Sequence, residues 1–184
     1  MTASLLDSAP GFDQPIAVLK HCHGRIRKQI RTMENLAIHL ALEGLDFDAQ
    51  QAANSVLRYF NKAAHHHHED EEQDLLPMLQ STAIGEDALL LDQVVSDIMN
   101  EHRQMNTVWT GLNQQLEAIS SGASAVLSPD DVEQFAALYQ AHMDKEETHI
   151  APMALRLFSR EQMDWLGHAM QTRRGIKPAT RNAE

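Results

Sequence analysis

The sequence predicts an all-α protein, an antiparallel up-down-up-down four-helix bundle with a short fifth helix at its C-terminal end. Three observations predict this fold. Apolar residues recur every three or four positions in four long runs, the segments between the runs are short, and 43% of the 184 residues are hydrophobic while only 5% are aromatic. Apolar residues at this spacing form one stripe along an α-helix, and short connections favour antiparallel neighbours.

The four apolar runs cover residues 16–40, 53–78, 91–119 and 132–153. Three segments that contain Gly, Ser or Pro separate them: 44–48, 81–85 and 120–129. In the last segment, Ser128 can cap the fourth helix while Pro129 takes its first position. A fifth helix is predicted to begin at Ser159, with Gln162 as its capping-box partner, and to end near Arg174. The predicted organisation is a bundle, a short helix and flexible termini: 14–158, 159–174, and 1–13 with 175–184.

The composition limits the partners and the compartment of the protein. A formal net charge of -11 argues against binding nucleic acid or an anionic membrane, since both need clustered Lys and Arg. The single cysteine, Cys22, cannot form an intramolecular disulfide, which favours a reducing cytoplasm. Residues 1–14 carry no basic residue before a hydrophobic run, unlike a secretory signal, and no apolar stretch reaches the roughly 18 to 20 residues of a membrane span.

A repeated polar motif is the main indication of function. Residues 67–77 and 142–152 both read His-x3-Glu-x5-Pro within apolar helical sequence. Four residues of α-helix advance about 400° and roughly 6 Å, so the His and Glu of each copy project from nearly the same face. Two such helices can direct two imidazoles and two carboxylates at one interior point, which predicts a dinuclear metal site. Pro77 and Pro152 are expected to kink or end their helices.

Each of the four apolar stripes also contains one histidine: His23, His67, His102 and His142. At about 1.5 Å per residue, His23 and His67 lie roughly 30 and 29 Å from the first loop, and the other pairs match within roughly 7 Å. A polar layer across an apolar bundle is therefore predicted. Such burial costs several kcal/mol for each unpaired charge, so a metal is expected to compensate it. Imidazole and carboxylate suit iron, manganese and zinc alike.

The sequence leaves several choices at this layer. In the histidine run 65–68, Phe60 and the repeat select His67, and the other three histidines and most of the acidic run 69–72 are expected to face solvent. His149, three residues after Glu146, is a candidate second motif. We read it and its repeat mate Asp74 as outer or access-route residues. Trp109, two turns beyond the helix-three histidine, is expected to form an apolar wall beside the site.

These motifs together resemble the hemerythrin-like, HHE cation-binding family over residues 14 to 158. The resemblance is carried by four segments: His23-Gly-Arg-Ile, the 67–77 segment, Glu101-His102 and His142-Met-Asp-Lys-Glu-Glu. It implies an antiparallel four-helix bundle that holds two non-haem iron ions, with both carboxylates bridging them. The implied ligands are His23, His67, Glu71, His102, His142 and Glu146.

Two positions depart from the oxygen-carrying members. Those proteins have a fifth histidine one turn from the helix-three ligand, where this chain has Ile98 and Asn106, so an exchangeable coordination position is expected. The oxygen carriers also space their last carboxylate five residues after its histidine, which would select Glu147, whereas the internal repeat favours Glu146.

The resemblance implies a protein that binds dioxygen or nitric oxide at a di-iron centre, for sensing or stress response. The alternative is a ferritin-like enzyme that oxidises iron, handles iron or detoxifies oxidants. Ferritin-like sites use two Glu-x2-His motifs, and this chain has one, Glu146-x2-His149. The sequence therefore favours a binding protein over an enzyme, and it does not indicate the oligomeric state.

Overall fold

A computed structural model of the chain describes residues 9–177, and all regular structure in this range is helical. The all-α prediction is therefore confirmed. Residues 1–8 and 178–184, which make up most of the termini predicted to be flexible, lie outside the described residues.

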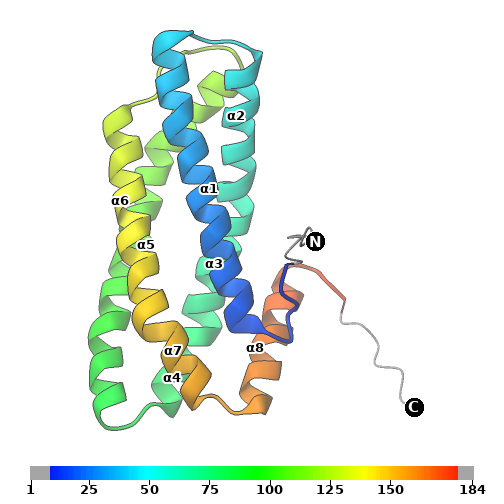
Figure 1. Ribbon diagram of the computed structural model, residues 1–184, viewed down its shortest axis with the longest axis vertical. Coiled ribbons are helices and arrows are strands. Elements are labelled where there is room, and N and C mark those ends of the chain that lie inside the picture. The colour runs from blue at the N-terminus through cyan, green and yellow to red at the C-terminus, as the bar shows by residue number, and fades with distance from the viewer. Residues whose placement is uncertain (1–8, 178–184) are drawn as a thin grey trace, which may run out of the picture.

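Four long helical segments form the body of the molecule. The first is α1 (Pro15–Leu42), and the third is α5 (Glu86–Ser120). The second runs without a break through five elements: α2 (Phe47–Arg58), η1 (Tyr59–Ala64), α3 (His65–Asp70), η2 (Glu71–Leu75) and α4 (Leu76–Thr82). The fourth consists of α6 (Pro129–Lys145), η3 (Glu146–Ile150) and α7 (Ala151–Leu157). Figure 1 shows these segments side by side, each running in the opposite direction to the one before it.

Side-chain caps begin the helices where the sequence predicts them. The Ser128 side chain accepts a hydrogen bond from the backbone N–H of Asp131 at the start of α6. Ser159 and Gln162 form the predicted capping box at the start of α8 (Arg160–Arg173). Each cap satisfies backbone N–H groups that have no partner within the helix.

Three π-helical turns interrupt the second and fourth segments. Two of them, η2 and η3, begin at Glu71 and Glu146, the glutamates of the repeated motif, and end just before the prolines. In each turn a backbone N–H donates a hydrogen bond to the carbonyl five residues earlier. Leu76 donates to Glu71, and Ala151 donates to Glu146. Of the two expected effects of the prolines, a kink or an end, the structure contradicts the end, since helix continues to residues 82 and 157. A wider turn before each proline accommodates a residue without a backbone N–H.

The apolar core is divided by a layer of polar side chains. One cluster packs the half of the bundle that includes Ile26, Ala64 and Met105, and a second packs the half that includes Leu19 and Leu75. The polar residues of the predicted site lie near the point on each helix where the apolar residues change from one cluster to the other. The layer is thus set at one height by the heptad-like spacing of the apolar residues around it.

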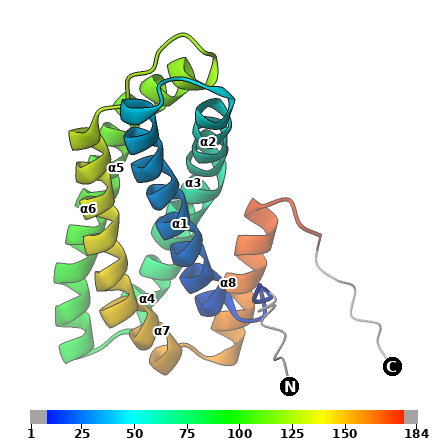
Figure 2. The same ribbon diagram turned by 45° about the horizontal axis from the view of Figure 1, so that its top comes forward.

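The fifth helix, α8, packs beside α1 and α3 outside the bundle, at the end that holds α4 and α7 (Figures 1 and 2). Asp70 is fully buried at this contact and forms ion pairs with Arg173 and Arg174. Gly167 is required because a Cβ there would lie 1.9 Å from the carbonyl oxygen of Phe12. The expectation that residues 69–72 mostly face solvent is wrong for Asp70, because α8 covers this face.

Within the described range, every helix is too short or too polar to traverse a lipid bilayer.

We predict that replacing both Arg173 and Arg174 with alanine lowers the free energy of unfolding by about 3–5 kcal/mol, because Asp70 would then be a buried charge without a partner. Urea denaturation measures the effect. Arg160→Ala, at the exposed start of the same helix, is the control and should change stability by less than about 0.5 kcal/mol. Equal effects would show that the Asp70 contact does not hold α8 in place.

Candidate metal centre

Seven buried side chains make up the polar layer. They come from all four helical segments, and each is at most 7% exposed: His23 from α1, His67 and His68 from α3, Glu71 from η2, His102 from α5, His142 from α6 and Glu146 from η3. The six residues selected from the sequence are therefore brought together, and one further histidine joins them.

The seven residues form two groups of potential ligands. His23, His67, Glu71 and Glu146 make the first group, and His68, His102 and His142 make the second. Within each group, one donor atom from every residue lies within 4.8 Å of the others. Nitrogen and oxygen atoms this close together can share one metal ion.

Both carboxylates belong to the first group and also face histidines of the second. One oxygen of Glu71, Oε1, lies 3.0 Å from Nε2 of His67, and the other, Oε2, lies 3.4 Å from Nε2 of His102. Oε2 of Glu146 lies 3.0 Å from Nε2 of His23 and 3.4 Å from Nε2 of His142. Each carboxylate thus faces a histidine of either group, as a carboxylate that bridges two ions must.

The expectation that the His68 side chain faces solvent is wrong. It is 7% exposed, its ring stacks on that of His102 with centroids 4.0 Å apart, and its Nε2 has no hydrogen-bond partner. Adjacent residues of a helix point about 100° apart. His67 and His68 can therefore both reach the interior if the direction midway between their side chains points at the bundle axis. His65 and His66 stay nearer the surface, where both contact Glu69.

The signal for His68 was the histidine run itself. The direction of the His68 side chain depends on the π-helical turn η1, which ends at Ala64 and alters the phase of the helix that follows. A single π turn has no clear mark in the amino-acid sequence, so the heptad count selected one inward histidine where the fold has two.

Many polar atoms of the layer make no hydrogen bond of regular geometry, even where another polar atom lies 3.0 Å away. The buried atoms in this state include His23 Nε2, both ring nitrogens of His67, His68 Nε2, Glu71 Oε2, His142 Nδ1 and both carboxylate oxygens of Glu146. Buried polar atoms are nearly always paired, and leaving them unpaired costs about 1–3 kcal/mol each. Their convergence in one layer fits bound cations, because imidazole nitrogen and carboxylate oxygen are both metal ligands.

The electrostatics of the layer favour neutral imidazole at His67, His68 and His102. Burial lowers the pKa of His67 and His68 well below the usual value, and burial is also the main cause of the lowered pKa of His102. At His23 burial also acts to lower the pKa, but Glu146 and Glu147 outweigh it, so that pKa is raised. Neutral imidazole is the form that binds a metal.

The two carboxylates have opposite shifts. Burial, reinforced by the nearby Glu146, raises the pKa of Glu71 well above its usual value. Burial also acts to raise the pKa of Glu146, but His142 and His23 outweigh it, so that pKa is lowered. Burial thus favours the protonated form of Glu71, and the neighbouring histidines favour the charged form of Glu146. A bound metal would favour the charged form of both carboxylates.

Three glutamates outside the layer orient its histidines. Glu147 lies 2.8 Å from Nδ1 of His23 and accepts a hydrogen bond from Arg27. Glu72 lies 2.6 Å from Nδ1 of His102. An outer carboxylate of this kind fixes the ring and leaves Nε2 directed at the centre.

The third outer glutamate is Glu101, which lies 3.4 Å from Nδ1 of His142 and also pairs with Lys145. The alternative residues from the sequence have other positions. Asp74 pairs with Arg173 of α8, and among the described residues His149 belongs to neither ligand group.

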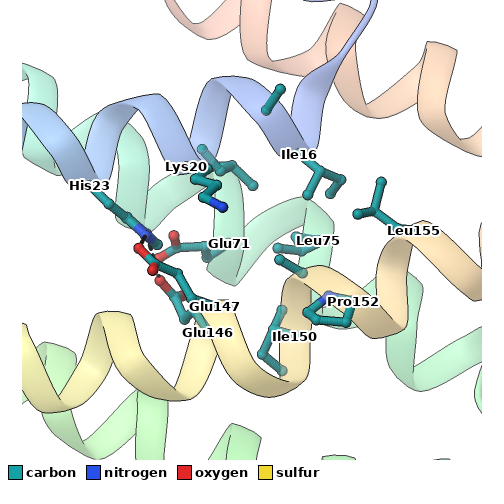
Figure 3. A pocket seen from close by; sticks show the side chains of 13 residues that line it. Ile16, Lys20, His23, Glu71, Leu75, Glu146, Glu147, Ile150, Pro152 and Leu155 are labelled. Carbon is teal, nitrogen blue, oxygen red and sulfur yellow. Dashed lines mark hydrogen bonds and ion pairs between the residues drawn. The ribbon is translucent and has the colours of Figure 1, made fainter.

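Two cavities reach the layer from different sides. One, of about 270 Å³, is lined by apolar residues of α1, η3 and α7 and reaches His23, Glu71 and Glu146. Figure 3 shows these three side chains meeting at one end of it. The other, of about 170 Å³, reaches His68 and is lined by Trp109 and other residues. Trp109 is therefore a wall of the second cavity, where its indole N–H donates to Asn61.

A helical bundle whose interior holds converging imidazoles and carboxylates is the architecture of a metal-binding bundle protein. The hemerythrin HHE cation-binding domain matches residues 9–154 of the chain. An uncharacterised protein of Haemophilus influenzae is 26% identical over 166 residues, which cover 90% of this chain and 93% of that protein. The chain belongs to the hemerythrin HHE cation-binding family, as the resemblance of its motifs predicted.

We predict that His68→Ala retains about half of the metal that the unmodified protein retains, because the second ligand group would keep only two histidines. His66→Ala is the control in the same helical turn and should leave the iron content unchanged. Elemental analysis after reconstitution with Fe(II) and gel filtration measures both. Full iron content in His68→Ala would assign this side chain to packing alone.

Proposed function

We propose that this protein is a non-haem di-iron protein that binds dioxygen or nitric oxide at its metal centre, for sensing or stress response. One observation carries the proposal. Seven buried side chains, six of which have polar atoms without a hydrogen-bond partner, form two adjacent ligand groups, and both carboxylates of the first group also face the second. Membership of a cation-binding family supports metal as the partner of these atoms.

In this proposal, each ion has its own histidines. His23 and His67 hold the first ion, and His68, His102 and His142 hold the second. Glu71 and Glu146 bridge the two, because each contacts a histidine of either group. The donors suit iron, and two carboxylates neutralise half of the charge of two divalent ions.

The uneven number of histidines indicates where a small ligand binds. With both carboxylates shared, the second ion has three histidines and the first has two. The first ion therefore has more coordination positions that an exchangeable ligand can occupy. The cavity of about 270 Å³ opens beside its ligands His23, Glu71 and Glu146. This differs from the sequence-based expectation, which placed the exchangeable position near Ile98 and Asn106. His68 supplies a fifth histidine from another helix.

Ferritin-like iron oxidation is the second candidate, and the position of His149 weighs against it. A ferritin-like site needs its Glu-x2-His motifs directed inward. Here the histidine of the one such motif is outside both ligand groups found in residues 9–177. A cytoplasmic location is part of the proposal, and the free thiol of Cys22 is compatible with it.

We predict that azide and nitric oxide each produce new charge-transfer absorption in the iron-loaded protein, because the ion held by two histidines can accept another ligand. Absorption spectra before and after each addition test this, with zinc-loaded protein as the control that has no such bands. Identical spectra with and without both ligands would make the metal centre structural.

We predict that Glu146→Ala leaves at most about one iron per chain, whereas Glu147→Ala still takes up two. Glu146 faces both ligand groups, whereas the one residue of the layer that Glu147 contacts is His23, at its outer nitrogen. Loss of such an outer carboxylate should weaken metal affinity by about 10- to 100-fold. Iron titrations of the two variants distinguish these effects, and the reverse ranking would make Glu147 the bridging ligand.

A further inference from the structure

The cavity beside the first ligand group is larger than a diatomic ligand requires. Its volume is about 270 Å³, roughly nine times the share of about 30 Å³ that one water molecule has in the liquid. Dioxygen and nitric oxide are comparable in size to water. The remaining space is enough for an organic molecule of modest size.

The walls of this cavity are mostly apolar. Aliphatic side chains from α1, η2, η3 and α7 form them: Ile16, Ala17, Leu19, Leu75, Ile150, Ala151, Pro152 and Leu155. Figure 3 shows Ile16, Pro152 and Leu155 at the end away from the metal layer. A hydrocarbon chain placed there would be removed from water, which contributes about 0.8 kcal/mol for each buried CH₂ group.

The polar groups of the cavity gather at its other end. His23, Glu71, Glu146 and Glu147 lie together there, and Lys20 is the one lysine or arginine of the lining. In Figure 3 the Lys20 side chain extends from α1 with its amino group directed into the cavity. A ligand that matches both ends has an apolar chain and a polar head.

The charge at the inner end of the cavity determines which polar head group a ligand should have. Two divalent ions would outweigh Glu71 and Glu146, and Glu147 is already paired with Arg27. Lys20 adds a further positive charge, so the inner end of the metal-loaded cavity favours an anion. Carboxylate oxygen can also contact the metal. Without metal, the same end presents glutamates and disfavours an anion.

We propose that this cavity binds a medium-chain monocarboxylate of about eight to ten non-hydrogen atoms, with the carboxylate between Lys20 and the first metal ion and the chain between Ile16 and Leu155. The proposal rests on the proposed function, because it places this ligand at the same di-iron centre. It adds an organic ligand class to a site that was otherwise assigned to diatomic molecules.

Calorimetric titration of the Fe(II)-loaded protein, under anaerobic conditions, tests the proposal with three probes. Octanoate carries both the head and the chain, acetate carries the head alone, and octylamine carries the chain with the opposite charge. We expect octanoate to bind at least about tenfold more tightly than acetate because of its buried methylenes. Octylamine should not bind detectably, and octanoate should not bind the metal-free protein.

Two variants separate the ends of the cavity. Lys20→Gln should weaken octanoate binding about threefold, the scale of one exposed charge pair, while Lys28→Gln on the same helix is the matched control without effect. Ala17→Leu fills the apolar part and should weaken octanoate binding but leave acetate binding and the azide spectrum unchanged.

The outcomes distinguish this proposal from the proposed function. If the protein holds two irons and responds to azide, but binds octanoate no more tightly than acetate, only the carboxylate proposal is overturned. Equal binding of octylamine, or equal binding of octanoate to the metal-free protein, would also overturn it. Failure to take up iron would overturn both.

Discussion

The burial of hydrogen-bonding side chains across the middle of an apolar bundle is the constraint on which the rest of this structure depends. Two apolar clusters hold the helices together on either side of the layer, but the layer itself has buried donor atoms without partners. Unpaired polar atoms of this kind cost free energy in proportion to their number. Cations at the layer would remove that cost, so metal binding and stability are coupled in this fold.

The unequal division of the ligands gives the two sides of the layer different chemistry. Three histidines and the cavity of about 170 Å³ lie on one side, while the other side has two histidines and the cavity of about 270 Å³. Glu71 and Glu146 lie between them because both begin a π-helical turn at the same level of the bundle. The repeated motif therefore determines which carboxylates face both ligand groups, and the unrepeated residues around it determine which cavity adjoins each side. Such turns are frequent at functional sites because they redirect a side chain without ending a helix.

The helical segment 65–75 connects the interior of the bundle with α8. Its inner face provides His67, His68 and Glu71, and its outer face provides Asp70, which pairs with arginines of α8. Outside the layer, carboxylates on α5 and η3 also fix the rings of histidines on neighbouring helices. The centre is thus supported by charged contacts from several helices. A displacement of α8 would move Asp70, which lies within one helical turn of His67, His68 and Glu71.

The sequence by itself determined the helical class, the caps at Ser128 and Ser159, and six of the seven residues in the layer. These follow from local rules: helical rise and rotation place residues of known spacing at a common level and face. Only the tertiary structure decided that His68 faces inward, that Asp70 is covered, and that the larger of the two cavities lies beside His23, Glu71 and Glu146. The reason is that helix phase after a π turn, and burial on a helix face, depend on the neighbouring helices that pack there, α5 and α6 around His68 and α8 over Asp70.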